Sequence, residues 1–153
     1  MYLLDTNHCS RLVEGQPTIT KRIEELEDAL VGIPAIVRGE LMFMAHKSDM
    51  KTDNLRLFRD FLADIHIYPI DEGVADIYGW IKGALLDYFG PREKARRRKA
   101  KVEKLGFSEN DLWIAATAKY HELVIVSADT DFNRMRQAVD LSLERWWTPD
   151  QKR

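Results

Sequence analysis

The chain has 153 residues, 45% hydrophobic and 31% charged, and a formal net charge of −2 at pH 7. This size fits one domain with a sizeable core, and the near-balanced charge excludes a polycation, so any nucleic-acid affinity must come from a local patch. Cys9 is the only cysteine, which excludes an intrachain disulfide and favours a cytoplasmic location. No apolar run approaches the roughly 18 residues that cross a bilayer, and the N-terminus lacks a signal-peptide pattern, so we expect no membrane association.

Short apolar runs alternate with helix-periodic segments along the chain. Strands are expected at 2–5, 33–37, 65–70 and 123–127, with an edge strand within 139–147, and helices at 8–14, 18–30, 38–46, 53–63, 71–89, 109–121 and 132–137. This alternation predicts an α/β fold in three α/β/α layers, with helices flanking a central, mostly parallel twisted sheet. No linker interrupts the pattern, so residues 1–153 are interpreted as a single domain.

Four acidic residues stand where these strands end or where helices begin. Asp5 ends the first strand, and Glu40 lies in the first turn of the helix after the second strand. Asp111 opens the helix before the last core strand, and Asp129 follows that strand. In a parallel sheet, such positions converge on one edge. Four carboxylates in a partly buried cleft would repel one another, and a hard cation such as Mg²⁺ or Mn²⁺ would relieve this repulsion. Phosphodiester hydrolysis by a metal-activated water is typical of such a site.

Each acid also has an ordinary structural interpretation. Asp5 can cap the next helix, Glu40 and Asp111 suit the positive end of a helix dipole, and Asp129 can sit in a turn. Only their joint placement indicates a metal site.

Several motifs resemble the PIN domain, and most closely the VapC-type toxins of bacterial toxin–antitoxin pairs. They are Tyr2-Leu3-Leu4-Asp5-Thr6-Asn7, Arg38-Gly39-Glu40-Leu41, the segment Asn110 to Ala118, and the segment Leu123 to Phe132. The resemblance implies a three-layer PIN-like fold and an endoribonuclease dependent on Mg²⁺ or Mn²⁺. It also implies a cognate VapB-type antitoxin and a homodimer.

The same resemblance implies roles for individual residues. Asp5, Glu40, Asp111 and Asp129 would be the catalytic metal ligands, and Asn7 and Ser127 would support them. Asp131 competes with Asp129 for the fourth ligand position, because both follow the last core strand within a few residues. Asp129 is the preferred ligand, and Asp131 is then a supporting or capping acid.

A basic run is the one marked change in composition. It extends from Arg92 to Lys104 inside an expected helical insertion at about 91–106, and contains Arg96, Arg97, Arg98 and Lys99. The run could be a solvated helical surface, could contact RNA phosphates, or could dock an acidic antitoxin tail.

The tryptophans and histidines are more simply explained by packing than by function. Trp80 and Trp113 are expected in the core, and Trp146 and Trp147 are expected to pack the last edge strand. The histidines have no ligand spacing; His8 is near enough to Asp5 to reach the cleft.

Two other enzyme or signalling classes on this fold require residues that the sequence lacks. An aspartyl-phosphate phosphatase would need an acid at Asn7, and a phospho-receiver domain would need a lysine at Ser127 or Ala128. A non-catalytic PIN-fold module that binds RNA or protein stays open as the alternative.

Overall fold

The computed structural model describes residues 1–149, and its centre is a parallel sheet of five strands in the order β3-β2-β1-β4-β5. The strands are β1 (Tyr2–Leu4), β2 (Val31–Pro34), β3 (His66–Tyr68), β4 (Val124–Val126) and β5 (Ser142–Glu144). Every neighbouring pair is parallel. Leu3 and Leu4 of the central strand are fully buried, as expected for a strand covered on both faces. The predicted α/β/α fold is therefore confirmed, with a sheet that is wholly parallel within the described residues.

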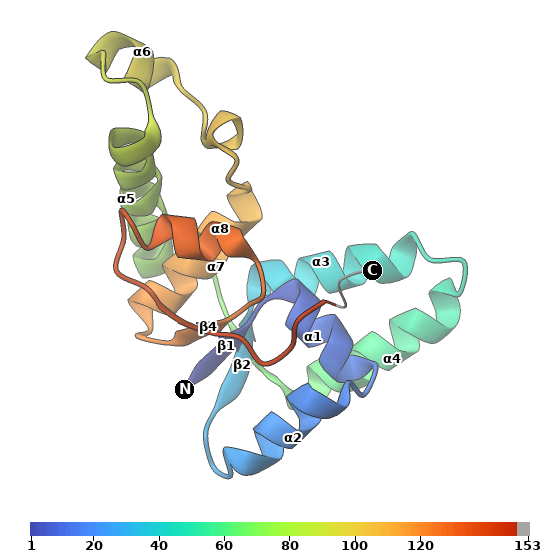
Figure 1. Cartoon of the computed structure of the whole chain (residues 1–153). Helices are drawn as coiled ribbons and strands as arrows, with labels where there is room; N and C mark the ends of the chain where they lie inside the picture. The colour runs from blue at the N-terminus through green and yellow to red at the C-terminus, as the bar shows by residue number, and fades with distance from the viewer. Residues whose placement is uncertain (150–153) are drawn as a thin grey trace.

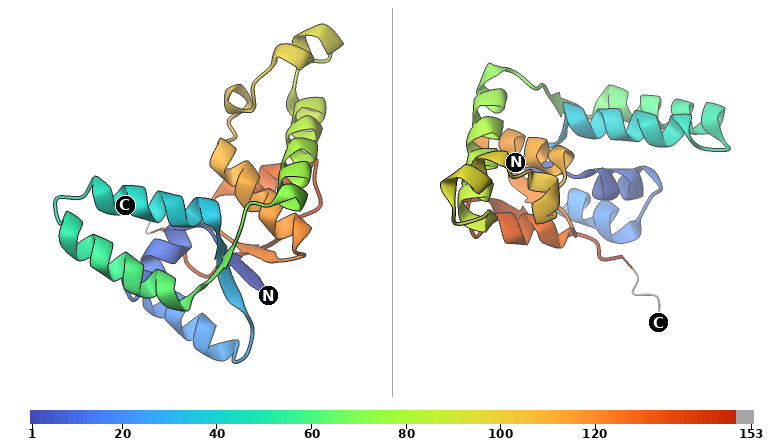
Figure 2. Two further views of the ribbon diagram at one scale, coloured as in Figure 1. Left: turned by 180° about the vertical axis from the view of Figure 1, so that it is seen from behind. Right: turned by 90° about the horizontal axis from the view of Figure 1, so that it is seen from above.

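Helices cover both faces of the sheet. One side carries α1 (Thr6–Val13), α2 (Pro17–Glu25), α3 (Ala35–His46) and α4 (Lys51–Asp64). The other side carries α5 (Glu72–Phe89), α7 (Glu109–Tyr120) and α8 (Thr130–Met135) (Figures 1 and 2). This division follows from the strand order, because right-handed crossovers that run in opposite directions from β1 place their helices on opposite faces.

The second strand and its helix differ from the sequence prediction. The apolar run at 33–37 is divided at Pro34, which ends β2 and occupies the N-cap position of α3. Ala35 to Val37 are helical, and Val37 packs in the core. Glu40 therefore lies in the second turn of α3, not in the first. A short apolar run fits a strand and a buried helical turn equally well, which explains this error.

The predicted helix at 18–30 was also too long. Helix α2 ends at Glu25, and Glu27 adopts a positive φ of 49°. This left-handed conformation cannot continue a right-handed helix, so Leu30 lies outside the helix, and its side chain is 42% exposed.

The basic insertion contains α6 (Lys94–Lys99) and a 3₁₀ helix, η1 (Val102–Leu105). Gly90 ends α5, and Gly106, with φ of 88°, ends η1. Helix α6 lies at the end of α5 that points away from the strands (Figure 1). Arg97 holds it there, because its Nε lies 3.1 Å from the Asp87 carboxylate and its Nη1 donates to backbone carbonyls 91 and 92.

The core expectations are confirmed in part. Trp113 is half-buried and stacks on Tyr78, with ring centroids 3.8 Å apart. Cys9 is buried, and burial raises the pKa of its thiol to about 12, which suits a packing role. The prediction for Trp80 was wrong: its side chain is 51% exposed on α5, with Lys119 over its ring.

Within residues 1–149, no helix is long and apolar enough to cross a membrane.

Candidate active site

A pocket of about 280 Å³ lies beyond the carboxyl ends of the central strands. Its lining consists of acidic, small polar and apolar side chains: Asp5, Thr6, Asn7, Glu40, Phe43, Met44, Asp111, Ile114 and Asp129. All four acids that the sequence singled out thus line one pocket, although they come from four separate segments. The parallel topology brings them together, since strands β1 and β4 end, and helices α3 and α7 begin, at the same edge of the sheet.

Asp5 is held by hydrogen bonds on both carboxylate oxygens. It caps α1, and its Oδ1 accepts the backbone N–H of His8 at 2.8 Å. The Ser127 hydroxyl donates to Oδ2 at 2.5 Å and also accepts the backbone N–H of Asp129 at 3.0 Å. Asp5 is only 5% exposed. Ser127 therefore ties the ends of β1 and β4 together.

Glu40 reaches the pocket from the middle of α3 and bridges two other helices. The side-chain amide of Asn110 donates to its Oε1 at 2.5 Å, and the Thr6 hydroxyl donates to its Oε2. Glu40 is thus fixed relative to the first turns of α1 and α7. Sequence reasoning did not single out Thr6 or Asn110. Their place beside Asp5 and Asp111 in the quoted motifs was a signal, but spacing alone could not show that both contact Glu40.

Asp111 lies among other carboxylates. Its carboxylate and those of Asp129 and Asp131 offer oxygens that lie within 4.8 Å of one another. The pKa of Asp111 is raised from 3.8 to about 7, first by burial and then by the charge of Asp129, with Glu40 and Asp131 adding to the effect. The Ser108 hydroxyl opposes this rise in pKa. Burial and the neighbouring carboxylates destabilise the ionised form of Asp111, and a divalent cation bound among these oxygens would stabilise it.

The two candidate acids after β4 differ in their partners. Asp131 pairs with Arg134, whose Nη1 lies 3.2 Å from its Oδ1. Arg134 is itself anchored, because its Nη2 donates to the Leu105 carbonyl at 2.8 Å. Asp129 caps α8, accepts the backbone N–H of Asp131 at 2.8 Å, and lines the pocket. Asp131 is absent from the pocket wall, but its carboxylate belongs to the same cluster as those of Asp111 and Asp129, so the preference for Asp129 as ligand stays a prediction.

The other predicted residues lie at different distances from the pocket. Asn7 is exposed on its wall. Arg96, Arg97, Arg98 and Lys99 are not among its lining residues; they belong to α6, at the remote end of α5 (Figure 1).

The structure adds an aromatic residue to the site: Phe43 is 64% exposed at the pocket, with Lys47 Nζ 5.1 Å from its ring centroid. Phe43 lies three residues after Glu40 and thus on the same face of α3.

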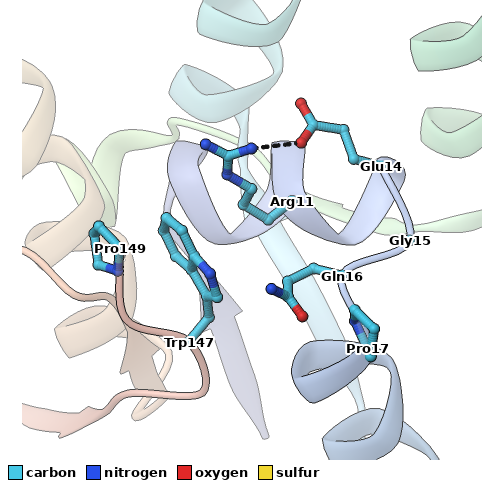
Figure 3. Close-up of a pocket in the computed structure, with 7 residues that line it drawn as sticks. All are labelled: Arg11, Glu14, Gly15, Gln16, Pro17, Trp147 and Pro149. Atoms are coloured by element: carbon cyan, nitrogen blue, oxygen red, sulfur yellow. Dashed lines mark hydrogen bonds and ion pairs between the residues drawn. The ribbon is translucent and has the colours of Figure 1, made fainter. Parts of the chain in front are cut away.

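A larger pocket of about 590 Å³ lies between the end of α1, the start of α2 and the C-terminal segment (Figure 3). Arg11 pairs with Glu14 at 2.7 Å and lies over Trp147, with its guanidinium carbon 5.0 Å from the ring centroid. None of the four clustered acids lines it. Size alone therefore does not identify the active site in this protein.

A parallel sheet with a carboxylate-lined pocket at its carboxyl edge fits an α/β nuclease domain. A model of the PIN domain matches residues 2–138, and the chain belongs to this family. It is 25% identical over 135 residues to the tRNA(fMet)-specific endonuclease VapC of Shigella flexneri, covering 88% of this chain and 91% of that protein.

Solved structures agree with this assignment. VapBC2 from Rickettsia felis, bound to a DNA fragment from its promoter, has a TM-score of 0.75 and 25% identity, with 95% of this chain and 98% of that chain covered. FitAcB from Neisseria gonorrhoeae has a TM-score of 0.65 and 27% identity, with 94% and 96% covered. The resemblance to VapC-type PIN domains that the motifs indicated is confirmed.

Proposed function

We propose that this protein is a VapC-type toxin: an endoribonuclease, dependent on Mg²⁺ or Mn²⁺, that hydrolyses RNA phosphodiester bonds. The observation that carries the proposal is the meeting of Asp5, Glu40, Asp111 and Asp129 in one pocket. The relationship to VapC proteins supports the nuclease class. The buried single cysteine fits a cytoplasmic protein, where RNA is available.

In the proposed mechanism, the four acids would hold the cation. When bound, Mg²⁺ or Mn²⁺ would supply Lewis-acid activation of the scissile phosphate and of the attacking water. The protein orients the ligands: Ser127 fixes Asp5, while Thr6 and Asn110 fix Glu40. Burial and the charge of Asp129 raise the pKa of Asp111 to about 7, so this carboxyl is only partly ionised at neutral pH, and a bound cation would favour its ionised form.

RNA would enter along α3. The exposed ring of Phe43 beside the pocket can stack a base, and Lys47 stands next to it for a phosphate. Arg98 and Lys99 are exposed on α6 and would contact RNA further from the scissile bond. Docking of an acidic antitoxin tail is the other use of this surface.

A VapB-type antitoxin is the proposed partner, because several similar solved structures are toxin–antitoxin complexes. We also propose that the protein forms a homodimer. Co-expression with the product of the neighbouring reading frame should yield a stable complex in which RNA cleavage is suppressed. Light scattering of the purified toxin should give twice the chain mass.

The test of the function is cleavage of structured RNA by purified protein with Mg²⁺ or Mn²⁺. Asp5→Ala and Asp111→Ala should abolish cleavage, while Asp49→Ala, an exposed acid between α3 and α4, should not. Cleavage that survives both site substitutions would remove the proposal. RNA binding that is unaffected by a chelator, with no product, would instead favour the non-catalytic RNA- or protein-binding module.

A further inference from the structure

His8 is a buried titratable residue for which the proposed mechanism has no use. It lies in the first turn of α1, and its side chain is inaccessible to solvent. Its Nδ1 is 3.1 Å from Asp5 Oδ1, and its Nε2 is 3.4 Å and 3.2 Å from the backbone nitrogens of Trp146 and Trp147. A backbone N–H can only donate, so Nε2 is the acceptor and the ring proton sits on Nδ1. The imidazole therefore donates to Asp5.

This donation determines how Asp5 can be used. Oδ1 accepts two hydrogen bonds, one from the backbone N–H of His8 and one from its ring. Oδ2 accepts one, from Ser127. Each carboxylate oxygen has two lone pairs, so Oδ1 is fully occupied and Oδ2 keeps one lone pair. His8 thus selects Oδ2 as the oxygen of Asp5 that remains for a cation.

The Nε2 side of the imidazole faces the backbone just after β5. Trp146 is buried against Tyr2, with ring centroids 5.1 Å apart, and its Nε1 donates to Glu144 at 2.7 Å. The ring of Trp147 meets the His8 ring edge-on at 6.0 Å and lies beside Arg11 (Figure 3). Both indoles are thus held in place, and both backbone N–H groups point at one imidazole nitrogen. That nitrogen joins the C-terminal segment to Asp5.

We propose that His8 is a positioning residue: its ring links the backbone N–H groups of Trp146 and Trp147 to the Asp5 carboxylate by hydrogen bonds and so orients this carboxylate for the cation. The inference rests on the proposed function, because it takes Asp5 to be a metal ligand. Groups that hydrogen-bond to metal ligands commonly contribute 10- to 100-fold to metal affinity. The C-terminal segment, distant from Asp5 in the sequence, becomes part of the metal site through this contact.

Three substitutions separate the two hydrogen-bonding sides of the ring. In His8→Asn, the side-chain amide nitrogen replaces Nδ1, so the donor to Asp5 is kept and the acceptor for the tryptophan N–H groups is lost. In His8→Gln, the amide oxygen takes the place of Nε2, so the acceptor is kept and the donor is lost. His8→Leu removes both. Thr117→Val is the matched control, since Thr117 is equally buried but donates only within its own helix.

The readouts are Mn²⁺ affinity by calorimetry and hydrogen exchange of the peptide that contains Trp146 and Trp147. We expect His8→Gln and His8→Leu to weaken Mn²⁺ binding roughly 10-fold or more. His8→Asn should stay within about threefold of wild type in affinity while amide exchange in the peptide accelerates. His8→Gln should keep slow exchange, and Thr117→Val should change neither.

The outcomes distinguish this inference from the proposed function. If the wild type binds no Mn²⁺, the metal site and the role of His8 fall together. If the wild type binds Mn²⁺ and folded His8→Gln and His8→Leu bind it equally well, the proposed function stands and His8 is only a core residue. Equal loss of affinity in Thr117→Val would also overturn the inference, since core destabilisation would then explain the effect.

Discussion

Replacing Asp111 by asparagine should make the metal-free protein more stable while removing its metal site. The folded pKa of Asp111 is about 7, against 3.8 for an ordinary aspartate, because of burial and neighbouring acids. The folded state therefore binds a proton more tightly than the unfolded state, and stability falls as the pH rises between these two values. One pKa unit corresponds to about 1.36 kcal/mol. Above the folded pKa, the charged side chain then costs up to about 4 kcal/mol.

Chemical denaturation with a chelator measures this cost. Solvent reaches the half-buried Asp111 and reduces the effect, so we expect Asp111→Asn to raise the free energy of unfolding by about 2–4 kcal/mol near pH 8. Near pH 5, the wild-type carboxyl is protonated in the folded state, and the gain should shrink below about 2 kcal/mol. Mn²⁺ should stabilise the wild type and the control Asp49→Asn, but not Asp111→Asn. Without the ion, Asp49→Asn should leave the free energy of unfolding unchanged. An Asp111→Asn protein that is no more stable than wild type near pH 8 would refute the electrostatic account.

Three further substitutions test other contacts of the site. Asn110→Ala removes the donor to Glu40 and should weaken Mn²⁺ binding roughly 10-fold in calorimetry; an unchanged affinity would mean that Glu40 needs no such support. Phe43→Ala should raise KM for RNA by about 5- to 100-fold, because one stacked base is lost, and should change kcat little. The control Leu57→Ala, at an exposed position, should change neither KM nor kcat. Arg134→Ala removes a hydrogen bond to η1 and the cation stacked on Phe107 and Phe89, and should lower the free energy of unfolding by about 1–3 kcal/mol. In thermal unfolding, no loss of stability would show that this contact is dispensable.

The sheet was predictable because its strands carry strong local signals. The run at 123–127 is mostly apolar, with β-branched residues at 124–126 that form β4. In the structure, Ser108 caps the start of α7. The alternation of elements then led to the convergence of the four acids. Pro34 was harder to interpret, since a proline can end a strand or precede a helix; it does both. That dual role moved Glu40 one turn further into its helix.

Long-range partners could not be read from the sequence. Nothing in the spacing indicates that Asn110 meets Glu40, or that the backbone after β5 meets His8, because such contacts depend on the packing of finished elements. Exposure of Trp80 was missed for a similar reason: the pattern of α5 is apolar on several sides, and only packing against α7 decides which side is covered. Three expectations stay predictions: that the whole chain forms a single domain, that α6 contacts RNA, and that the protein forms a homodimer.

The most direct test of the metal site is anomalous scattering from crystals of the protein soaked in MnCl₂. The proposed function predicts an anomalous peak inside the acidic pocket, about 2–2.4 Å from carboxylate oxygens of Asp5 and Asp111, and its loss in Asp111→Asn. Manganese that occupies only surface positions in the wild type, with no peak within reach of Asp5, would contradict the claim that these acids assemble to bind a catalytic cation.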